Sequence, residues 1–197
     1  PDNYSFFLSL GAISNIGPKF FGDSVKFWND AFAHPDYDEW WKARDPRQYL
    51  KNIAPAVMTV GGWFDAEDLY GALHTYEAIE KQNSQGVKNT IVMGPWSHGQ
   101  WAFGEGNNLG NVYWGLDANK DFADLEKRFF DLYLKGEGAG NIPEARIFVT
   151  GANEWRSSET WPPKNVTEKN IYFLPRGAAS FTPSKEKESF DEYVSDP

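Results

Sequence analysis

Two apolar runs of strand length, separated by a helical pattern, constrain the fold of this chain most strongly. Residues 54–61 (APAVMTVG) and 89–94 (NTIVMG) are short, apolar and end in glycine, which is typical of buried parallel strands. Between them, apolar residues recur on one helical face, at Leu69, Ala72, Leu73, Tyr76 and Ile79. A strand, a helix and a second strand within about 40 residues predict a right-handed βαβ unit, and therefore an α/β fold.

The two ends of the chain have other sequence patterns. Residues 1–52 are rich in aromatic residues and glycine and contain short helical patterns, such as SVKFWNDAFA. After residues 53–138, which hold the βαβ unit and a further amphipathic helix, ARIFVTG and NIYFLPRG predict short antiparallel strands. We therefore expect a helical region over 1–52, an α/β region over 53–138 and a β region over 144–197, with a domain boundary near 136–143.

Composition excludes several classes of function. The 197 residues include no cysteine, which excludes disulfides, Cys-ligated zinc and thiol catalysis. The net charge is −9 without a basic cluster, so a nucleic-acid surface is not expected. No apolar run approaches the roughly 20 residues of a membrane span. No signal peptide is visible, and the chain begins with Pro1. We interpret it as a piece of a longer protein, and both a secreted or periplasmic and a cytoplasmic location stay open.

Each predicted strand is followed by a residue suited to proton transfer. Asp65 follows the first strand and His98 the second, and ligands of open α/β sheets bind at the carboxyl ends of parallel strands. An Asp beside a His can orient the imidazole and stabilise its protonated form, which suits general acid–base catalysis. Simpler interpretations are a helix cap for an Asp at this position, which would suffice for Asp68, and a solvated loop histidine.

The sequence motifs at the two junctions support this hypothesis. GGWFDAED and MGPWSHGQ, with Asp65 and His98 33 positions apart, resemble the acid and histidine motifs of the cocaine-esterase-like (CocE/NonD) hydrolases. This family includes X-Pro dipeptidyl-peptidases, α-amino-acid ester hydrolases and glutaryl-aminocephalosporanic acid acylases. AHPDYDEWWKARDPRQYLKNI resembles the end of the family's helical cap, and ARIFVTGANEWRSSETWPP resembles the opening of its jelly-roll domain.

The resemblance implies a fold and an activity. The three regions would be the end of the cap (1–52), the C-terminal part of an α/β-hydrolase core (53–138) and the first strands of an all-β jelly roll (144–197). The activity would be cleavage of ester or amide bonds, including X-Pro dipeptidyl bonds, in a small-molecule or peptide substrate. A Ser–Asp–His triad would carry it, with Asp65 as acid, His98 as base, and neither cofactor nor metal.

The serine of this triad is not found in the sequence. The family places it in a G-x-S-x-x-G elbow after an earlier strand, whereas GDSVK around Ser24 lacks the later glycine and a preceding strand. We interpret Ser24 as a surface residue. Since the chain order in this class is Ser, acid, His, we expect the nucleophile to precede Pro1 and the chain alone to be inactive. An uncovered sheet would also favour homo-oligomers or strand exchange.

Substrate-binding residues are harder to assign. In family members that prefer α-amino substrates, carboxylates bind the ammonium group, and Asp38, Glu39 or Glu67 could contribute here. Trp63 and Trp96 could line a pocket, with core packing as the alternative. HPDYDE could be a metal loop, but a solvated loop is favoured.

Two other functions stay open. One is an aromatic-rich carbohydrate- or protein-binding module. The other is a glycosidase, which needs two paired carboxylates, although no spacing in the sequence selects such a pair.

Overall fold

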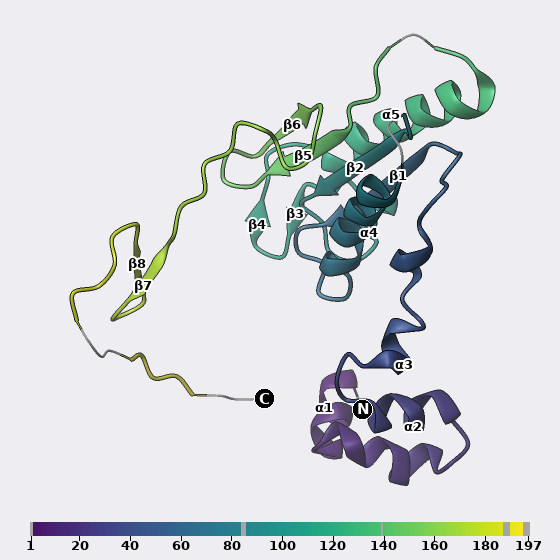
Figure 1. The fold of residues 1–197 in the computed structure, drawn as a ribbon. Coiled ribbons are helices and arrows are strands. Elements are labelled where there is room, and N and C mark those ends of the chain that lie inside the picture. Colours follow the sequence, from purple (N-terminus) through teal and green to yellow (C-terminus); the bar gives the residue numbers. More distant parts are fainter. Residues whose placement is uncertain (1, 84–85, 139, 187–189, 195–197) are drawn as a thin grey trace. The chain divides into compact units, whose positions relative to one another are not determined.

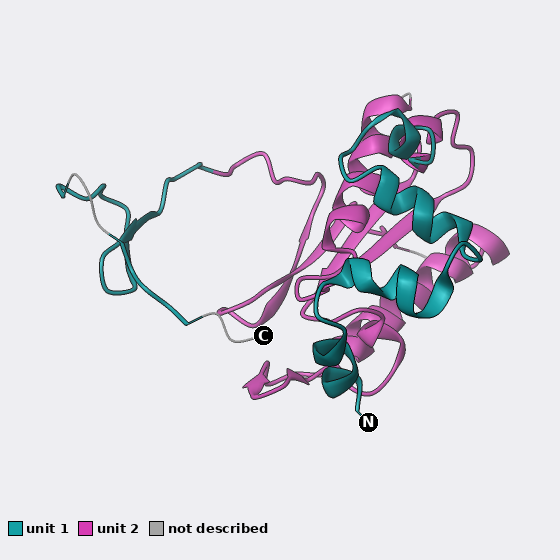
Figure 2. Ribbon diagram, turned by 90° about the horizontal axis from the view of Figure 1, so that it is seen from below, with its two compact units in different colours: residues 1–45, 167–197 teal, residues 46–166 magenta. Residues whose placement is uncertain are grey.

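The structure of the chain, a computed structural model, describes residues 2–83, 86–138, 140–186 and 190–194. It divides into two units (Figure 2). Residues 46–166 form one, called here the α/β unit; residues 1–45 and 167–197 belong to the other.

The α/β unit is built on a four-stranded sheet in the order β1-β2-β5-β6 (Figure 1). Strands β1 and β2 are parallel and in register from Val57 opposite Asn89 to Gly62 opposite Gly94. Their carboxyl ends are therefore level, and the residues that follow them leave the same edge of the sheet. The strands are β1 (Val57–Gly62), β2 (Asn89–Gly94), β5 (Ala145–Val149) and β6 (Glu154–Ser158).

Helices α4 (Leu69–Gln82) and α5 (Ala118–Phe130) cover opposite faces of this sheet. Ile91 and Met93 of β2 pack with α4, while Val92 between them packs with α5. All three are fully buried, and each such side chain contributes about 1.5–3 kcal/mol by leaving water. The predicted βαβ unit is confirmed, with the second strand at the expected residues.

The region after residue 144 differs from the expected one. β5 is a strand, but it pairs in parallel with β2 and antiparallel with β6. ARIFVTG is therefore part of the α/β sheet. Its residues Ala145 and Phe148 are buried on opposite faces of that sheet. The α/β unit continues to residue 166, and the division does not fall at 136–143.

The last segment forms one antiparallel hairpin. β7 (Tyr172–Leu174) and β8 (Ala178–Ser180) pair around a turn, as expected for NIYFLPRG. Asp191 accepts hydrogen bonds from the amides of Arg176 and Gly177 in that turn. One hairpin does not define a sandwich, so the jelly roll stays a prediction. Residues 187–189 and 195–197 of the expected β region lie outside the described residues.

The described residues up to Asp45 are largely helical, as expected. They form α1 (Asn3–Leu10), a 3-10 turn (Ile13–Asn15), a π-helical turn (Gly17–Phe21), α2 (Lys26–Ala33) and α3 (Glu39–Lys42). Their role as a cap stays a prediction. The α/β unit also holds 3-10 turns at Pro46–Tyr49 and Gln100–Ala102, the two-residue strands β3 (Asn108–Leu109) and β4 (Val112–Tyr113), and a π-helical turn, Asp131–Lys135.

Two further findings concern a membrane and a second copy of the chain as partners. In the part of the chain that the structure describes, no helix has both the length and the apolar character that crossing a bilayer requires. β1 lies at the edge of the sheet, and among the described residues only β2 pairs with it. Self-association through this edge stays a prediction.

Candidate active site

The two strand–helix junctions are joined by backbone hydrogen bonds beyond the strands themselves. The amide of Trp63 donates to the carbonyl of Gly94 (2.9 Å), and the amide of Phe64 donates to the carbonyl of Trp96 (3.0 Å). These bonds continue the parallel pairing past the last residues of β1 and β2. The turn after β1 therefore follows the loop after β2 closely.

Two glycines make this close approach possible. A Cβ on Gly62 would lie 2.1 Å from the carbonyl oxygen of Trp96, and one on Gly94 would lie 2.2 Å from the Trp96 ring. Real Cβ atoms are not found at such distances, so any larger residue would push the junctions apart. The close approach of the two junctions thus requires glycine at Gly62 of GGWFD and at Gly94 of MGPW.

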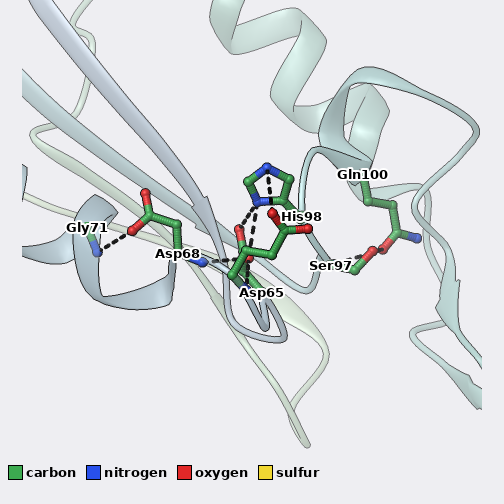
Figure 3. A network of polar contacts seen from close by, with 7 residues as sticks. Asp65, Asp68, Gly71, Ser97, His98 and Gln100 are labelled. Carbon is green, nitrogen blue, oxygen red and sulfur yellow. Dashed lines mark hydrogen bonds and ion pairs between the residues drawn. The ribbon is translucent and has the colours of Figure 1, made fainter. Parts of the chain in front are cut away.

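Asp65 lies in the turn between β1 and α4, where its carboxylate is fixed from two sides. Its Oδ1 accepts hydrogen bonds from the amides of Glu67 (2.8 Å) and Asp68 (2.9 Å). Its Oδ2 lies 3.0 Å from Nδ1 of His98 (Figure 3). Only 3% of the Asp65 side chain is exposed, so the carboxylate has little freedom to turn away from the imidazole.

His98 lies in the loop after β2 and is half exposed, at 53% of its side chain. An ionised Asp65 can only accept a hydrogen bond, so the shared hydrogen belongs to Nδ1 of the imidazole. This leaves Nε2 as the nitrogen that can accept a proton. The expected proximity of Asp65 and His98 is present, and the arrangement suits a general base oriented by a carboxylate.

The charges of the pair stabilise each other. Burial raises the pKa of Asp65, but the amides of Asp68 and Glu67 and the His98 imidazole outweigh burial and hold this pKa below its usual value. The hydrogen bond to Asp65, followed by its negative charge and that of Glu67, raises the pKa of His98. The pair therefore favours an ionised acid beside a base with increased proton affinity.

The loop around His98 is held by hydrogen bonds that no sequence motif indicated. The amide and the hydroxyl of Ser97 both donate to Oε1 of Gln100, at 3.0 and 3.2 Å, and Nε2 of Gln100 donates to the carbonyl of Asn108. The Ser97 hydroxyl, although next to His98 in sequence, is thus committed to Gln100. These residues hold the base in place, which spacing alone does not reveal.

The acidic residues after Asp65 have separate roles. Oε2 of Glu67 lies 3.9 Å from Nε2 of His98, and 73% of the Glu67 side chain is exposed. Asp68 caps α4, because its Oδ1 accepts from the amide of Gly71. Glu67 is therefore the carboxylate of this turn that is available beside the proton-accepting nitrogen.

The two tryptophans expected at a pocket are used in packing. Trp96 is fully buried, and its indole N–H donates to Oδ1 of Asn119. Trp63 packs against the core on the α4 face, and its indole donates to the carbonyl of Phe148. The pocket interpretation of Trp96 is corrected, since a fully buried ring cannot touch a ligand. Trp63 is only partly buried, and its place at a pocket stays a prediction.

The candidates in the helical segment lie in the other unit. Nδ1 of His34 is 2.5 Å from Oδ2 of Asp38, whose Oδ1 caps α3 through the amides of Trp40 and Trp41. The Ser24 hydroxyl donates to the carbonyl of Phe21. Asp38 as a substrate-binding residue stays a prediction. Across the described residues, no group of three or more His, Cys, Asp or Glu side chains is placed to hold a metal ion.

Comparisons with known proteins point to one group of hydrolases. The family model of the X-Pro dipeptidyl-peptidases (S15 family) matches residues 19–100. Cocaine esterase of Rhodococcus sp. (strain MB1 Bresler) is 30% identical over 177 residues, which cover 83% of this chain and 29% of the esterase. The chain thus spans less than a third of that relative.

Two solved structures are similar over 99% of the chain. One is an aminopeptidase from a marine sediment archaeon, Thaumarchaeota archaeon, with a TM-score of 0.84 and 31% identity. The other is an α-amino acid ester hydrolase, with a TM-score of 0.82 and 31% identity. The chain covers 32% and 33% of these two structures.

Proposed function

This chain belongs to the CocE/NonD family of hydrolases, and we propose that it carries two members of a Ser–Asp–His triad. Asp65 is the acid and His98 the general base. The observation that carries the proposal is the distance of 3.0 Å between a buried carboxylate and Nδ1 of a half-exposed imidazole, at the carboxyl ends of two adjacent parallel strands. A non-catalytic binding module requires no such pair.

The proposed reaction is acyl transfer to a serine and then to water. Neutral His98 takes the proton of the serine hydroxyl at Nε2 while the oxygen attacks the ester or amide carbonyl. Asp65 stabilises the imidazolium that forms, and the imidazolium gives the proton to the leaving alcohol or amine. Water then repeats the sequence on the acyl-enzyme and releases the acid. No cofactor takes part in these steps.

The serine of this triad is proposed to lie on a part of the protein outside these 197 residues. GDSVK does not form an elbow motif, and the Ser24 and Ser97 hydroxyls donate to Phe21 and Gln100. Without the nucleophile, His98 and Asp65 have no hydroxyl to activate. The 197-residue chain alone is therefore expected to be inactive.

An organophosphorus reagent that phosphorylates activated serines tests this assignment. In the full-length protein we expect one labelled serine, found by peptide mass spectrometry outside the present sequence, and no labelling after His98→Ala. Label on Ser24, or labelling that is independent of His98, would contradict the triad. The 197-residue chain should show neither labelling nor turnover of p-nitrophenyl acetate.

For the substrate, we propose acyl groups that carry a free α-ammonium. Glu67 supports this, because its exposed carboxylate lies 3.9 Å from Nε2 of His98 and can pair with a cation beside the reacting carbonyl. The names of the two structural relatives, an aminopeptidase and an α-amino acid ester hydrolase, agree with such substrates.

The experiment compares phenylglycine methyl ester with phenylacetic acid methyl ester, which lacks only the ammonium. In the full-length protein, Glu67→Gln should lower kcat/KM for the first ester about tenfold, as expected for a lost charged contact, and leave the second nearly unchanged. Equal losses on both esters would remove Glu67 from ammonium recognition while leaving the triad intact.

A further inference from the structure

The loop that carries His98 is fastened by one buried amide side chain at the start of α5. Asn119 is 7% exposed, and its Oδ1 accepts a hydrogen bond from the indole N–H of Trp96 at 2.7 Å. Its Nδ2 donates to carbonyl oxygens of the loop, namely those of Gln100 (2.9 Å), Phe103 (2.8 Å) and Gly104 (3.1 Å). Two N–H hydrogens thus serve three carbonyls, and every polar atom of the amide has a partner.

These contacts lie on both sides of the histidine. Trp96 precedes His98 by two residues and Gln100 follows it by two. The backbone amide of Asn119 also donates to the carbonyl of Glu105, at 3.1 Å. One residue therefore ties the beginning and the end of the loop to the same helix.

The neighbouring backbone leaves room for this amide and for nothing larger. Gly106 has a φ of +63°, and a Cβ there would lie 2.0 Å from Oδ1 of Asn119 and 3.0 Å from Nε1 of Trp96. A residue with a side chain at this position would displace the hydrogen bond between the two. The loop is thus shaped around the Asn119–Trp96 contact.

We propose that Asn119 is a positioning residue, which holds the loop from Trp96 to Glu105 so that His98 faces Asp65. It acts through the loop and touches neither the imidazole nor the carboxylate. Replacing it with alanine leaves the Trp96 indole and the loop carbonyls without their buried partner. The loop then gains freedom, and His98 spends less time within reach of Asp65. The consequence for catalysis rests on the proposed function, whereas the effect on the Asp65–His98 contact does not.

The test is an NMR titration of the His98 ring in the 197-residue chain. The His98 signal is identified by its loss in His98→Ala. We expect the titration midpoint to fall in Asn119→Ala, in the direction given by Asp65→Asn, because the contact with Asp65 is what raises the pKa of His98. An unchanged midpoint in folded Asn119→Ala would overturn the proposal.

Asn89→Ala is the matched control. Asn89 is also buried, and its Nδ2 donates to the carbonyl of Tyr76 and to Oε1 of Glu80. It lies at the start of β2, whose other end leads to His98, so its loss should destabilise the unit without moving the midpoint. An equal shift in both variants would mean that general loosening, and not the loop contact, sets the titration of His98.

Asn119→Ser covers the case in which the alanine variant does not fold. Its shorter side chain carries a single O–H, which can donate to at most one of the three carbonyls that Asn119 serves. The midpoint should then lie between those of the wild type and Asp65→Asn, and a wild-type midpoint counts against the proposal. Because no turnover is measured, this result is independent of whether the protein proves to be a serine hydrolase.

Discussion

The described residues include two Asp–His pairs of similar local geometry and different surroundings. Asp65 pairs with His98 across 33 positions, between two strand ends, and Asp38 pairs with His34 across four positions beside a short helix. The first carboxylate is 3% exposed and the second 42%. A hydrogen-bonded Asp–His pair is therefore not in itself a sign of a catalytic site.

What separates the pairs is the burial of the carboxylate, since both carboxylates accept two backbone amides. The amides of Glu67 and Asp68 fix the buried Asp65, so its Oδ2 faces the imidazole. The carboxylate of Asp38 also accepts from two backbone amides, those of Trp40 and Trp41, but 42% of it is exposed, so water competes for its oxygens. A catalytic base requires an environment that is pre-organised and shielded from water, and of the two carboxylates only that of Asp65 has one.

The largest expected difference between the pairs is in turnover. In the full-length protein, His98→Ala should lower kcat for p-nitrophenyl acetate by ~10⁴-fold or more, because the serine loses its base. His34→Ala should change kcat less than about threefold. If His34→Ala were the inactivating variant, the site would have to be moved to the helical segment.

The second comparison exchanges each carboxylate for its amide. Asp65→Asn should lower kcat by about 10³-fold, since the imidazolium loses its counter-charge and the imidazole its orientation. It should also move the acidic limb of the pH–rate profile to lower pH, because the pKa of His98 is raised chiefly by the hydrogen bond to Asp65. Asp38→Asn should leave both the rate and the limb in place. An acidic limb that does not move in Asp65→Asn would contradict the coupling.

The third comparison concerns the glycines. Gly62→Ala should lower the free energy of unfolding by about 1–3 kcal/mol, as overpacking does, because its Cβ would collide with the Trp96 carbonyl. Gly17→Ala in the helical segment is the control. Its Cβ would lie 3.4 Å from Nε1 of Trp28, an ordinary contact, and a change within about 0.5 kcal/mol is expected. Urea unfolding measures both, and equal effects would show that the junction can relax.

The central part of this site was predictable from the sequence, because it depends on periodicity and strand ends. The apolar run NTIVMG marked β2 at its observed bounds, and two residues just past parallel strand ends had to share one edge of the sheet. The closeness of Asp65 and His98 followed if the two strands are neighbours, and the resemblance of GGWFDAED and MGPWSHGQ to family motifs supported the pairing.

The parts that were not predictable depend on neighbours distant in the chain. ARIFV has five residues with a charge at the second, and it is an inner strand because β2 and β6 pair on either side of it and Arg146 forms an ion pair with Asp121. The sequence likewise could not tell whether Trp96 fills the core or lines a pocket. Asn119 bonds mainly to backbone carbonyls, which carry no sequence signature.

The smallest expected effect is the pH dependence of stability that each pair contributes. The pKa of Asp65 is lowered in the folded chain, so its contribution is present above the unfolded value of about 3.9 and is lost as pH falls through the folded value. The pKa of His98 is raised, so its contribution is complete below about 6.5 and is lost as pH rises through the folded value. Both contributions are present between about pH 4 and 6.5.

The measurement is urea unfolding of the wild-type chain and of Asp65→Asn across this range. The stability lost in Asp65→Asn should be greatest near pH 5 and smaller at pH 9, where His98 is neutral and the carboxylate keeps only an uncharged hydrogen bond from Nδ1 and its contacts with the amides of Glu67 and Asp68. The change should be small, because solvent screens the half-exposed His98. Asp38→Asn should give a flatter profile, since both members of that pair are more evenly exposed. A loss in Asp65→Asn that grows from pH 5 to pH 9 would mean that Asp65 does not favour protonated His98. The Asp65–His98 pair would then resemble the Asp38–His34 pair in making no greater pH-dependent contribution to stability.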